Sequence, residues 1–256
     1  MSQTPSPDGA APSPEGPADS LWQALGWGPD DRQRHQLQEL QQQLREWNGR
    51  LNLTRLVEGD DYWIAQVLDS LWPLRALLQA PPAAPLQLID VGTGGGIPGL
   101  AVAIALPSAR LTLVDSVGRK VEAVRAMAAA LGLAERVSLR TERVERSGHD
   151  PALRGRFQLA MARAVAAAPV VAEYLVPLLA PQGRALLYRG QWSATDGRAL
   201  ERAAAVLRAR VDRVERQELP GGRGLRHAVW LTPDGPCPPA YPRAIGVPAK
   251  LPLGAA

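Results

Sequence analysis

Apolar residues in the first third of the chain recur at helical spacing. Between residues 31 and 47 they return every three or four positions among Gln and Arg, which predicts one amphipathic helix. Residues 60–79 show the same spacing and predict a second helix, kinked at Pro73 and ended by Pro81-Pro82. We expect an N-terminal helical extension, residues 20–82, that docks its apolar stripe on the rest of the chain. The stripe of the first helix consists of Leu37, Leu40, Leu44 and Trp47.

Beyond residue 83, short apolar runs alternate with helical segments. This alternation predicts an α/β fold in which a mostly parallel, seven-stranded sheet carries helices on both faces, within a domain of residues 83–233. The last two apolar runs are joined only by residues 219–225, too few for a crossover helix, so we expect an antiparallel last strand. The expected strands cover residues 86–90, 110–115, 136–140, 157–162, 183–189, 211–217 and 226–232, and the expected helices cover residues 98–106, 117–131, 168–179 and 194–208.

Composition adds two segments outside this pattern. Residues 1–19 hold seven Gly or Pro and are expected to form a disordered lead, and residues 234–256 are expected to form an irregular, Pro-rich tail. No apolar run reaches the ~20 residues of a membrane span, and the N-terminus lacks a signal-peptide pattern, so we expect a cytoplasmic protein without membrane contact. The single cysteine, Cys237, excludes a disulfide framework and a cysteine metal cluster.

The charge distribution favours a polyanionic partner. The net charge is +4, yet residues 1–20 contribute only acidic side chains, so the remainder of the chain is more basic than the total indicates. RNA is the natural candidate, although basic proteins without a nucleic-acid role are common.

A glycine-rich stretch follows the first expected strand. Gly94, Gly96 and Gly99 match the pattern G-x-G-x-x-G, and Asp115 ends the next apolar strand at about the expected distance of ~20 residues. Glycines leave backbone N–H groups bare at the start of a helix, and an acidic residue at this distance suits ribose hydroxyls. The stretch therefore predicts a nucleoside-binding site of the kind that NAD, FAD and S-adenosylmethionine proteins share.

Asp90 favours S-adenosylmethionine among these ligands. It ends the first expected strand directly before the glycines. A carboxylate there repels a pyrophosphate and attracts the sulfonium and ammonium groups of S-adenosylmethionine. A dinucleotide is the alternative, as is a glycine turn that binds no ligand.

Short motifs occur in a fixed order along the chain. They are Trp47-Asn48, Asn52-Leu53-Thr54, Val67-Leu68-Asp69-Ser70, Asp90 to Gly99, Leu113-Val114-Asp115-Ser116, Gly118-Arg119-Lys120, Arg143-Val144-Glu145, Ala162-Arg163-Ala164, Tyr241-Pro242-Arg243 and Gly246-Val247-Pro248. Together they resemble the RsmG family, also called GidB, of bacterial 16S rRNA guanine-N7 methyltransferases. The resemblance implies a class I, Rossmann-like methyltransferase fold, S-adenosylmethionine as cofactor and 16S rRNA as partner.

The resemblance also implies roles for individual residues. Gly92 and Ile97 would line the methionine and ribose side of the donor, although Ile97 could equally fill the core. Asp115 would take the ribose hydroxyls. Val144-Glu145 would flank the adenine. The full expected donor-binding set is Asp90, Gly92, Gly94, Gly96, Ile97, Asp115, Val144, Glu145 and Arg163.

Arg163 and Asp69 are the expected catalytic residues. By resemblance, Arg163 closes the site near the methionine end or the incoming base, beyond the carboxyl end of a strand, where open α/β sheets bind ligands. The alternatives are a simple ion pair between Arg163 and Glu145, and an Asp69 that only caps local backbone. The chain departs from the family at Gln66, where His is usual, and this removes a titratable group. It also has Arg189-Gly190 in place of Lys-Gly, which keeps the charge.

The implied reaction is methyl transfer to N7 of a guanine, by resemblance the one at rRNA position 527 in the decoding-region loop. N7 carries its lone pair in the ring plane, so alignment suffices without a catalytic Cys, His or metal. The alternatives are an NAD(P)-binding oxidoreductase and a catalytically idle donor-binding RNA-binding or regulatory protein. We expect a monomer that acts on the small subunit or an assembly intermediate. The basic candidates for phosphate contacts are Arg55, Arg119, Lys120, Arg189 and Arg243.

Overall fold

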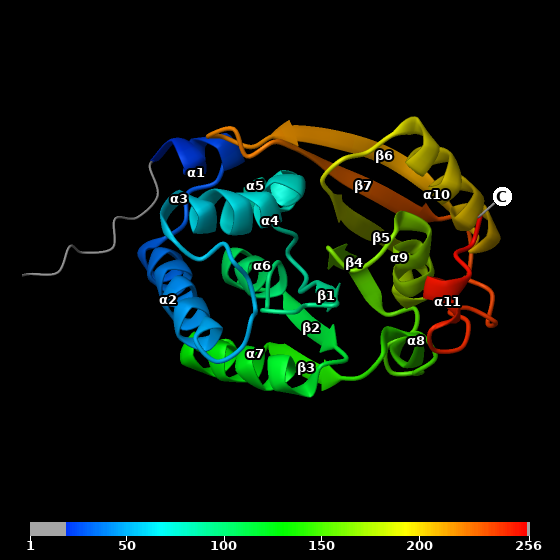
Figure 1. Cartoon of the computed structure of the whole chain (residues 1–256), viewed down its shortest axis with the longest axis horizontal. Helices are drawn as coiled ribbons and strands as arrows, with labels where there is room; N and C mark the ends of the chain where they lie inside the picture. The colour runs from blue at the N-terminus through cyan, green and yellow to red at the C-terminus, as the bar shows by residue number, and fades with distance from the viewer. Residues whose placement is uncertain (1–18, 255–256) are drawn as a thin grey trace, which may run out of the picture.

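The computed structural model describes residues 19–254 and is built on one seven-stranded sheet (Figure 1). The strand order is β3-β2-β1-β4-β5-β7-β6, and only β7 runs antiparallel to its neighbours. The predicted α/β sheet with one antiparallel strand is confirmed. The strands are β1 (Gln87–Val91), β2 (Arg110–Asp115), β3 (Val137–Thr141), β4 (Phe157–Arg163), β5 (Leu179–Arg189), β6 (Ala209–Glu218) and β7 (Leu225–Pro233).

Helices cover both faces of this sheet. Successive residues of a strand point to opposite faces, so Leu88 is buried in one hydrophobic core and Ile89 in the other. The first core lies under α6 (Gly99–Ala105) and α7 (Gly118–Ala130). The second lies under α8 (Val144–Ser147), α9 (Ala168–Leu175), the 3-10 turn η3 (Val176–Leu178) and α10 (Ala194–Val206).

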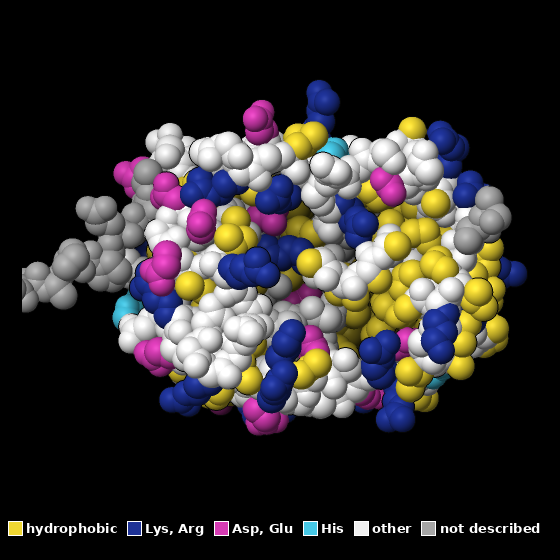
Figure 2. Space-filling model, viewed as in Figure 1, with side chains coloured by type: hydrophobic (Ala, Val, Ile, Leu, Met, Phe, Trp, Pro, Cys, Tyr) yellow, Lys and Arg dark blue, Asp and Glu magenta, His cyan; other side chains and the backbone are white. Residues whose placement is uncertain are grey.

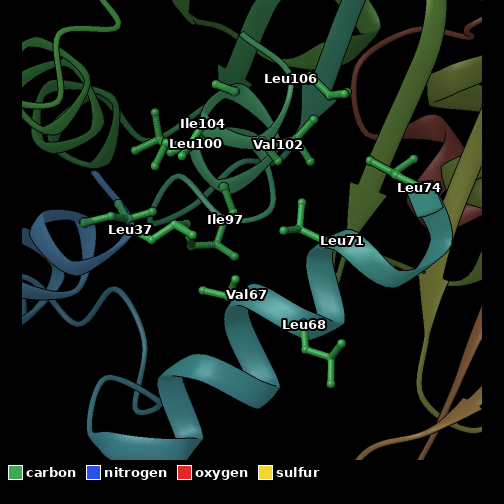
Figure 3. Packing of buried hydrophobic residues seen from close by; sticks show 14 of the residues in the cluster. Leu37, Val67, Leu68, Leu71, Leu74, Ile97, Leu100, Val102, Ile104 and Leu106 are labelled. Atoms are coloured by element: carbon green, nitrogen blue, oxygen red, sulfur yellow. The ribbon is translucent and has the colours of Figure 1, made fainter. Parts of the chain in front are cut away.

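The N-terminal helices pack on α6 and share the first core (Figure 3). After a short helix α1 (Asp19–Leu25), which the sequence pattern did not predict, α2 (Asp31–Asn48) starts at Asp30 with a capping box that includes Gln33. The side-chain amide of Gln33 donates to the backbone carbonyl of Ile104 in α6 at 3.0 Å. The predicted docking of this helix on the sheet domain is therefore observed.

The predicted helix over residues 60–79 is not one continuous α-helix. A π-helical segment, η1 (Trp63–Leu68), interrupts it. Pro73 falls in a 3-10 turn because its ring nitrogen cannot donate a helical hydrogen bond. Val67 and Leu71 still point toward α6 in Figure 3. The segments are α3 (Gly59–Tyr62), η1, α4 (Asp69–Leu71), η2 (Trp72–Leu74) and α5 (Arg75–Gln79).

The Pro-rich tail packs against the sheet domain although little of it is regular. Within its described residues, 234–254, the one helix is α11 (Val247–Lys250), which lies beside α9, as the red segment in Figure 1 shows. The predicted disordered lead falls almost wholly outside the described residues, since α1 already begins at Asp19. Within residues 19–254, no helix combines the length and hydrophobicity needed to cross a membrane.

Candidate functional site

A cleft of about 860 Å³ opens at the carboxyl ends of the parallel strands. It lies where the strand order reverses between β1 and β4, the place where open α/β sheets bind ligands. Figure 2 shows a hollow near the middle of this face with dark blue Lys and Arg side chains around it. Its walls come from the glycine loop after β1, the ends of β2, β4 and β5, the loop after β3, and the segment that follows α2.

Three glycines of the loop, Gly92, Gly94 and Gly95, line the cleft, and two of them have positive φ angles. Gly92 and Gly94 line the cleft and have positive φ angles of 71° and 57°. A Cβ on Gly92 would lie 2.5 Å from Val165, whereas a Cβ on Gly94 would meet nothing closer than 3.9 Å. Gly96 does not line the cleft, and its missing side chain makes room for Leu100 instead. Of the three glycines predicted to bind the donor, Gly92 and Gly94 therefore face the cleft, whereas Gly96 allows close packing against Leu100.

Asp90 lies behind this loop and is fully buried. Its Oδ2 accepts hydrogen bonds from the Thr93 hydroxyl at 2.7 Å and the Gly99 backbone N–H at 3.0 Å. Its Oδ1 has no hydrogen-bond partner among residues 19–254. Burial raises the pKa of Asp90 to about 6, and the two hydrogen bonds partly oppose that rise. One oxygen thus organises the loop. Asp90 itself does not line the cleft, so the predicted attraction to a cationic donor would act from behind the glycine loop and not by direct contact.

Asp115 and Ile97 both line the cleft, as the sequence predicts for donor-binding residues. Oδ2 of Asp115 accepts from the Gly94 N–H at 2.9 Å, and Oδ1 accepts from the Val117 N–H at 2.8 Å. Each carboxylate oxygen keeps a further lone pair, which suits a pair of ribose hydroxyls. The backbone contacts fix the carboxylate before any ligand arrives.

Val144 lines the cleft and Glu145 does not, although the sequence predicts both beside the adenine. The Glu145 carboxylate is buried and points into the protein, where Oε1 accepts from the Tyr174 hydroxyl at 3.3 Å and from the Gly246 N–H at 3.0 Å. Its second oxygen, Oε2, has no partner in the described part of the chain. The Glu145 side chain therefore joins the C-terminal segment to the cleft wall.

Arg163 and Asp69, the predicted catalytic pair, are brought together across 94 residues of sequence. Arg163 ends β4, and its Nη1 donates to Asp69 Oδ2 at 3.3 Å and to the Ala65 carbonyl at 3.1 Å. Asp69 is 7% exposed, and burial raises its pKa while Arg163 and Arg226 lower it. The ion pair of Arg163 is thus with Asp69, and the alternative pairing with Glu145 is not seen.

Gln66 holds Arg163 from the π-helical segment. Its Oε1 accepts from Nη2 of Arg163, and its Nε2 donates to the Thr54 hydroxyl at 2.8 Å. Asn48 holds the other side of the same loop, with its Oδ1 accepting from the backbone N–H groups of Leu53 and Thr54. An amide thus bridges the arginine and the loop that closes one side of the cleft.

The basic side chains of the cleft differ in part from those predicted. Lys120 and Arg189 line it as expected, whereas Arg55 and Arg119 do not. Arg243 lies elsewhere, in an ion pair with the buried Glu173 at 2.7 Å.

Two further arginines, Arg143 and Arg226, line the cleft without a predicted role. Because β7 is antiparallel, its first residues lie at the edge where the neighbouring strands end, and that topology was the signal for Arg226.

The strand order, the glycine loop and the acidic residue at the end of β2 together define a class I methyltransferase. The sequence matches the GidB family, described as rRNA small subunit methyltransferase G, over residues 33–223. It is 66% identical over 232 residues to Ribosomal RNA small subunit methyltransferase G of Synechococcus sp. (strain RCC307), covering 91% of this chain and 97% of the relative. The chain therefore belongs to the rRNA small subunit methyltransferase G family.

The chain is also similar to further proteins. The protein of the same name from Parasynechococcus marenigrum (strain WH8102) is 60% identical over 254 residues, covering 99% of this chain and all of the relative. Among solved structures, TrmN from Thermus thermophilus has a TM-score of 0.47 and 20% identity, covering 64% of this chain and 48% of that one.

Family membership makes this chain an S-adenosylmethionine-dependent methyltransferase of small-subunit rRNA and excludes the oxidoreductase alternative.

Proposed function

We propose that the chain transfers a methyl group to N7 of a guanine in 16S rRNA. The observation that supports this is that each carboxylate of the described cleft lining is held by an ion pair or by backbone N–H groups. Its carboxylates are already engaged: Asp69 by Arg163, Asp115 by two backbone N–H groups, and Glu142 by the Arg140 guanidinium at 2.7 Å. Methylation of an exocyclic amine or a hydroxyl requires that a proton leave, but attack by N7 does not.

The remaining titratable groups of the lining fit the same chemistry. Burial raises the pKa of Tyr174 to about 12 and that of Tyr188 well above its usual value, so both phenols keep their protons. The described lining contains no His or Cys. Alignment of the acceptor nitrogen with the donor methyl group, rather than proton transfer, is then the main task of the site.

We assign the donor and the base to opposite halves of the cleft. The donor would lie across Gly92, Gly94 and Asp115, with its adenine beside Val144. The guanine would enter beside Arg163, which its contacts with Asp69 and Gln66 hold as a fixed positive charge. Such a charge favours the electron-rich O6 and N7 edge of guanine.

A guanine analogue tests the proposal directly. An RNA fragment or reconstituted subunit carrying 7-deazaguanosine at the target position lacks the N7 lone pair but keeps every exocyclic group. We expect methyl transfer from S-adenosylmethionine to the normal RNA and none to the analogue. Transfer to the analogue at an equal rate would refute N7 as the acceptor. No transfer to either RNA, with donor binding retained, would support a catalytically idle protein.

The form of the substrate is a second part of the proposal. Basic residues around the cleft suit an RNA backbone, and unstacking a base is easier in a loop than in a duplex. We propose that the chain acts as a monomer in the cytoplasm on the small subunit or an assembly intermediate. Parallel assays on free rRNA, a partly assembled particle and the finished subunit identify the substrate, and light scattering measures the oligomeric state.

A further inference from the structure

The chain after β7 returns to the cleft as a C-terminal strap, which we define as residues Cys237–Leu251. Its first part is fixed by Arg154, whose guanidinium donates to the backbone carbonyls of Cys237, Pro238 and Tyr241 at 2.6–3.0 Å. The whole strap lies outside the family match, which ends at residue 223. These hydrogen bonds show that the strap packs against the sheet domain as an ordered segment.

Two buried carboxylates anchor the second part of the strap. Glu173 is fully buried and accepts from the backbone N–H of Arg243 at 2.7 Å and from its Nε at 2.9 Å. Glu145 is 2% exposed and accepts from the backbone N–H of Gly246 at 3.0 Å. A buried carboxylate without partners is strongly destabilising. The strap therefore stabilises Glu173 and Glu145 in their buried positions, and the two carboxylates hold the strap in place.

Glu145 also reaches the cleft wall. The Tyr174 hydroxyl donates to its Oε1 at 3.3 Å, and the Arg143 guanidinium lies 3.5 Å from the same oxygen. Tyr174 and Arg143 both line the cleft, with Val144 between Arg143 and Glu145 in sequence. One buried carboxylate therefore connects the strap to two residues of the cleft wall, Tyr174 and Arg143.

The strap itself forms part of that wall. Ala249, in α11, lines the cleft, and α11 packs against α9, which supplies Tyr174. Ala249, with its small side chain, and the ring of Tyr174 both contribute apolar atoms to the cleft lining. A flat aromatic base packs against apolar atoms better than a charged or flexible group does.

We propose that the C-terminal strap is part of the donor-binding site, where it forms the wall against the adenine and is held there by Glu145 as a positioning residue. The proposal rests on the proposed function in one respect, the placement of the adenine beside Val144. It explains why Glu145 is buried at this position although its side chain does not face the ligand space.

The first test removes the anchors and keeps the wall residues. We expect Glu145→Ala and Arg243→Gln each to raise the Kd for S-adenosylmethionine about tenfold in calorimetry. We expect Glu145→Gln, which keeps an acceptor oxygen, to bind within about threefold of wild type. The turnover at saturating donor should stay within about threefold of wild type for all three variants, because the strap binds the donor and does not touch the acceptor.

A matched control shows whether loss of any ion pair weakens donor binding, or only loss of a contact that anchors the strap. Arg223→Gln removes an exposed pair with Asp61, 2.9 Å long, on residues that do not line the cleft. This variant should bind the donor as wild type does. Circular dichroism and thermal melting show which variants are folded, and only folded variants are compared.

The second test adds a bulky side chain to the strap where it lines the cleft and leaves the anchoring residues Glu145, Glu173 and Arg243 unchanged. Ala249→Trp places a large ring at the cleft rim, whereas Lys250→Trp adds the same ring one residue further on, at an exposed position that does not line the cleft. We expect the first substitution to raise the donor Kd at least about tenfold and the second to change it less than about twofold. Equal donor binding by both Trp variants and by the anchor variants overturns the strap proposal. Absence of donor binding in the wild type would instead overturn the donor site itself.

Discussion

Asp90 shows how one side chain can serve the site at a cost in stability. Its Oδ2 organises the glycine loop, its Oδ1 is buried without a partner, and burial raises its pKa to about 6. A group whose pKa is higher in the folded than in the unfolded chain binds protons more tightly when folded. Stability contributed by that group is therefore lost as the pH rises from about 4 through 6. The expected loss is ~3 kcal/mol for a rise of about two pKa units.

Asp90→Asn removes the charge and keeps the shape. We expect the variant to gain about 3 kcal/mol in free energy of unfolding at pH 8 and almost nothing at pH 4, because the folded aspartate is already neutral there. Urea unfolding at both pH values measures this. We expect the donor Kd to rise about tenfold at pH 8, because the uncompensated charge is lost. Equal stability of variant and wild type at pH 8 would contradict the pKa assignment.

Gly94 and Gly96 have positive φ for different reasons, and alanine distinguishes them. A Cβ at Gly96 would lie 2.7 Å from Leu100, so Gly96→Ala should lower the free energy of unfolding by about 2–3 kcal/mol with little effect on donor Kd in the folded fraction. Gly94→Ala meets no close atom and should cost about 1 kcal/mol, yet weaken donor binding at least about tenfold. Thermal melts and calorimetry on both variants test this contrast, and a reversed order of the two effects would be evidence against it.

At the scale of elements, the π-helical segment η1 determines how Arg163 is held. A π-turn changes the helical register, and here the Ala65 carbonyl accepts from Arg163 at 3.1 Å while Gln66 binds both Arg163 and Thr54. The segment therefore links β4, the loop after α2 and the cleft. An ordinary α-helix over residues 60–79, as the sequence pattern predicts, would place these side chains differently.

Substitution of Gln66 tests that link. Gln66→Leu removes the acceptor of Arg163 Nη2 and the link from Arg163 to the Thr54 hydroxyl, while Nη1 keeps Asp69 and the Ala65 carbonyl; we expect kcat/KM to fall about 10- to 100-fold. Gln66→His restores a ring acceptor and should recover most of this activity at pH 8. Below its ordinary pKa of about 6.5 the imidazole becomes a cation facing Arg163, so this variant should lose more activity between pH 7 and 6 than the wild type, in which Asp90 gains a proton over this range. Parallel pH–rate profiles of the wild type and the two variants measure this. Identical profiles would show that Gln66 does not position Arg163.

At the scale of the whole molecule, the helical extension and the sheet share one hydrophobic core. Leu37 and Leu40 of α2 belong to the same cluster as Leu100 of α6 and Leu113 of β2. Since neither part buries its apolar face without the other, we expect the described chain to unfold as one cooperative unit.

Leu40→Ala tests this unity. Leu40 is fully buried, so the substitution should lower the free energy of unfolding by about 2–5 kcal/mol. Tryptophan fluorescence and far-UV circular dichroism should still give coincident single transitions. Leu225→Ala, at a residue 44% exposed, is the control and should change stability by less than about 0.5 kcal/mol. Two separated transitions for Leu40→Ala would mean that extension and sheet fold independently.

What the sequence by itself determined is the local part of this protein. Alternating strands and helices, the glycine loop after β1 and Asp115 after β2 depend on residues that are near one another along the chain, so their spacing was enough to predict the sheet, its antiparallel strand and the donor class. The positions of β1 to β4 agree with the predicted ranges within a residue or two.

Only the tertiary structure decided which side chains meet in the cleft. Arg163 pairs with Asp69 across 94 residues, and Glu145 binds Gly246 across 101, and no local pattern encodes either contact. The same holds for Arg226, which reaches the cleft because β7 runs antiparallel, and for a Pro-rich tail that packs because two buried carboxylates need partners. Hydrogen bonds and ion pairs between distant segments depend on where the folded backbone brings them, and only packing of the complete chain sets that geometry.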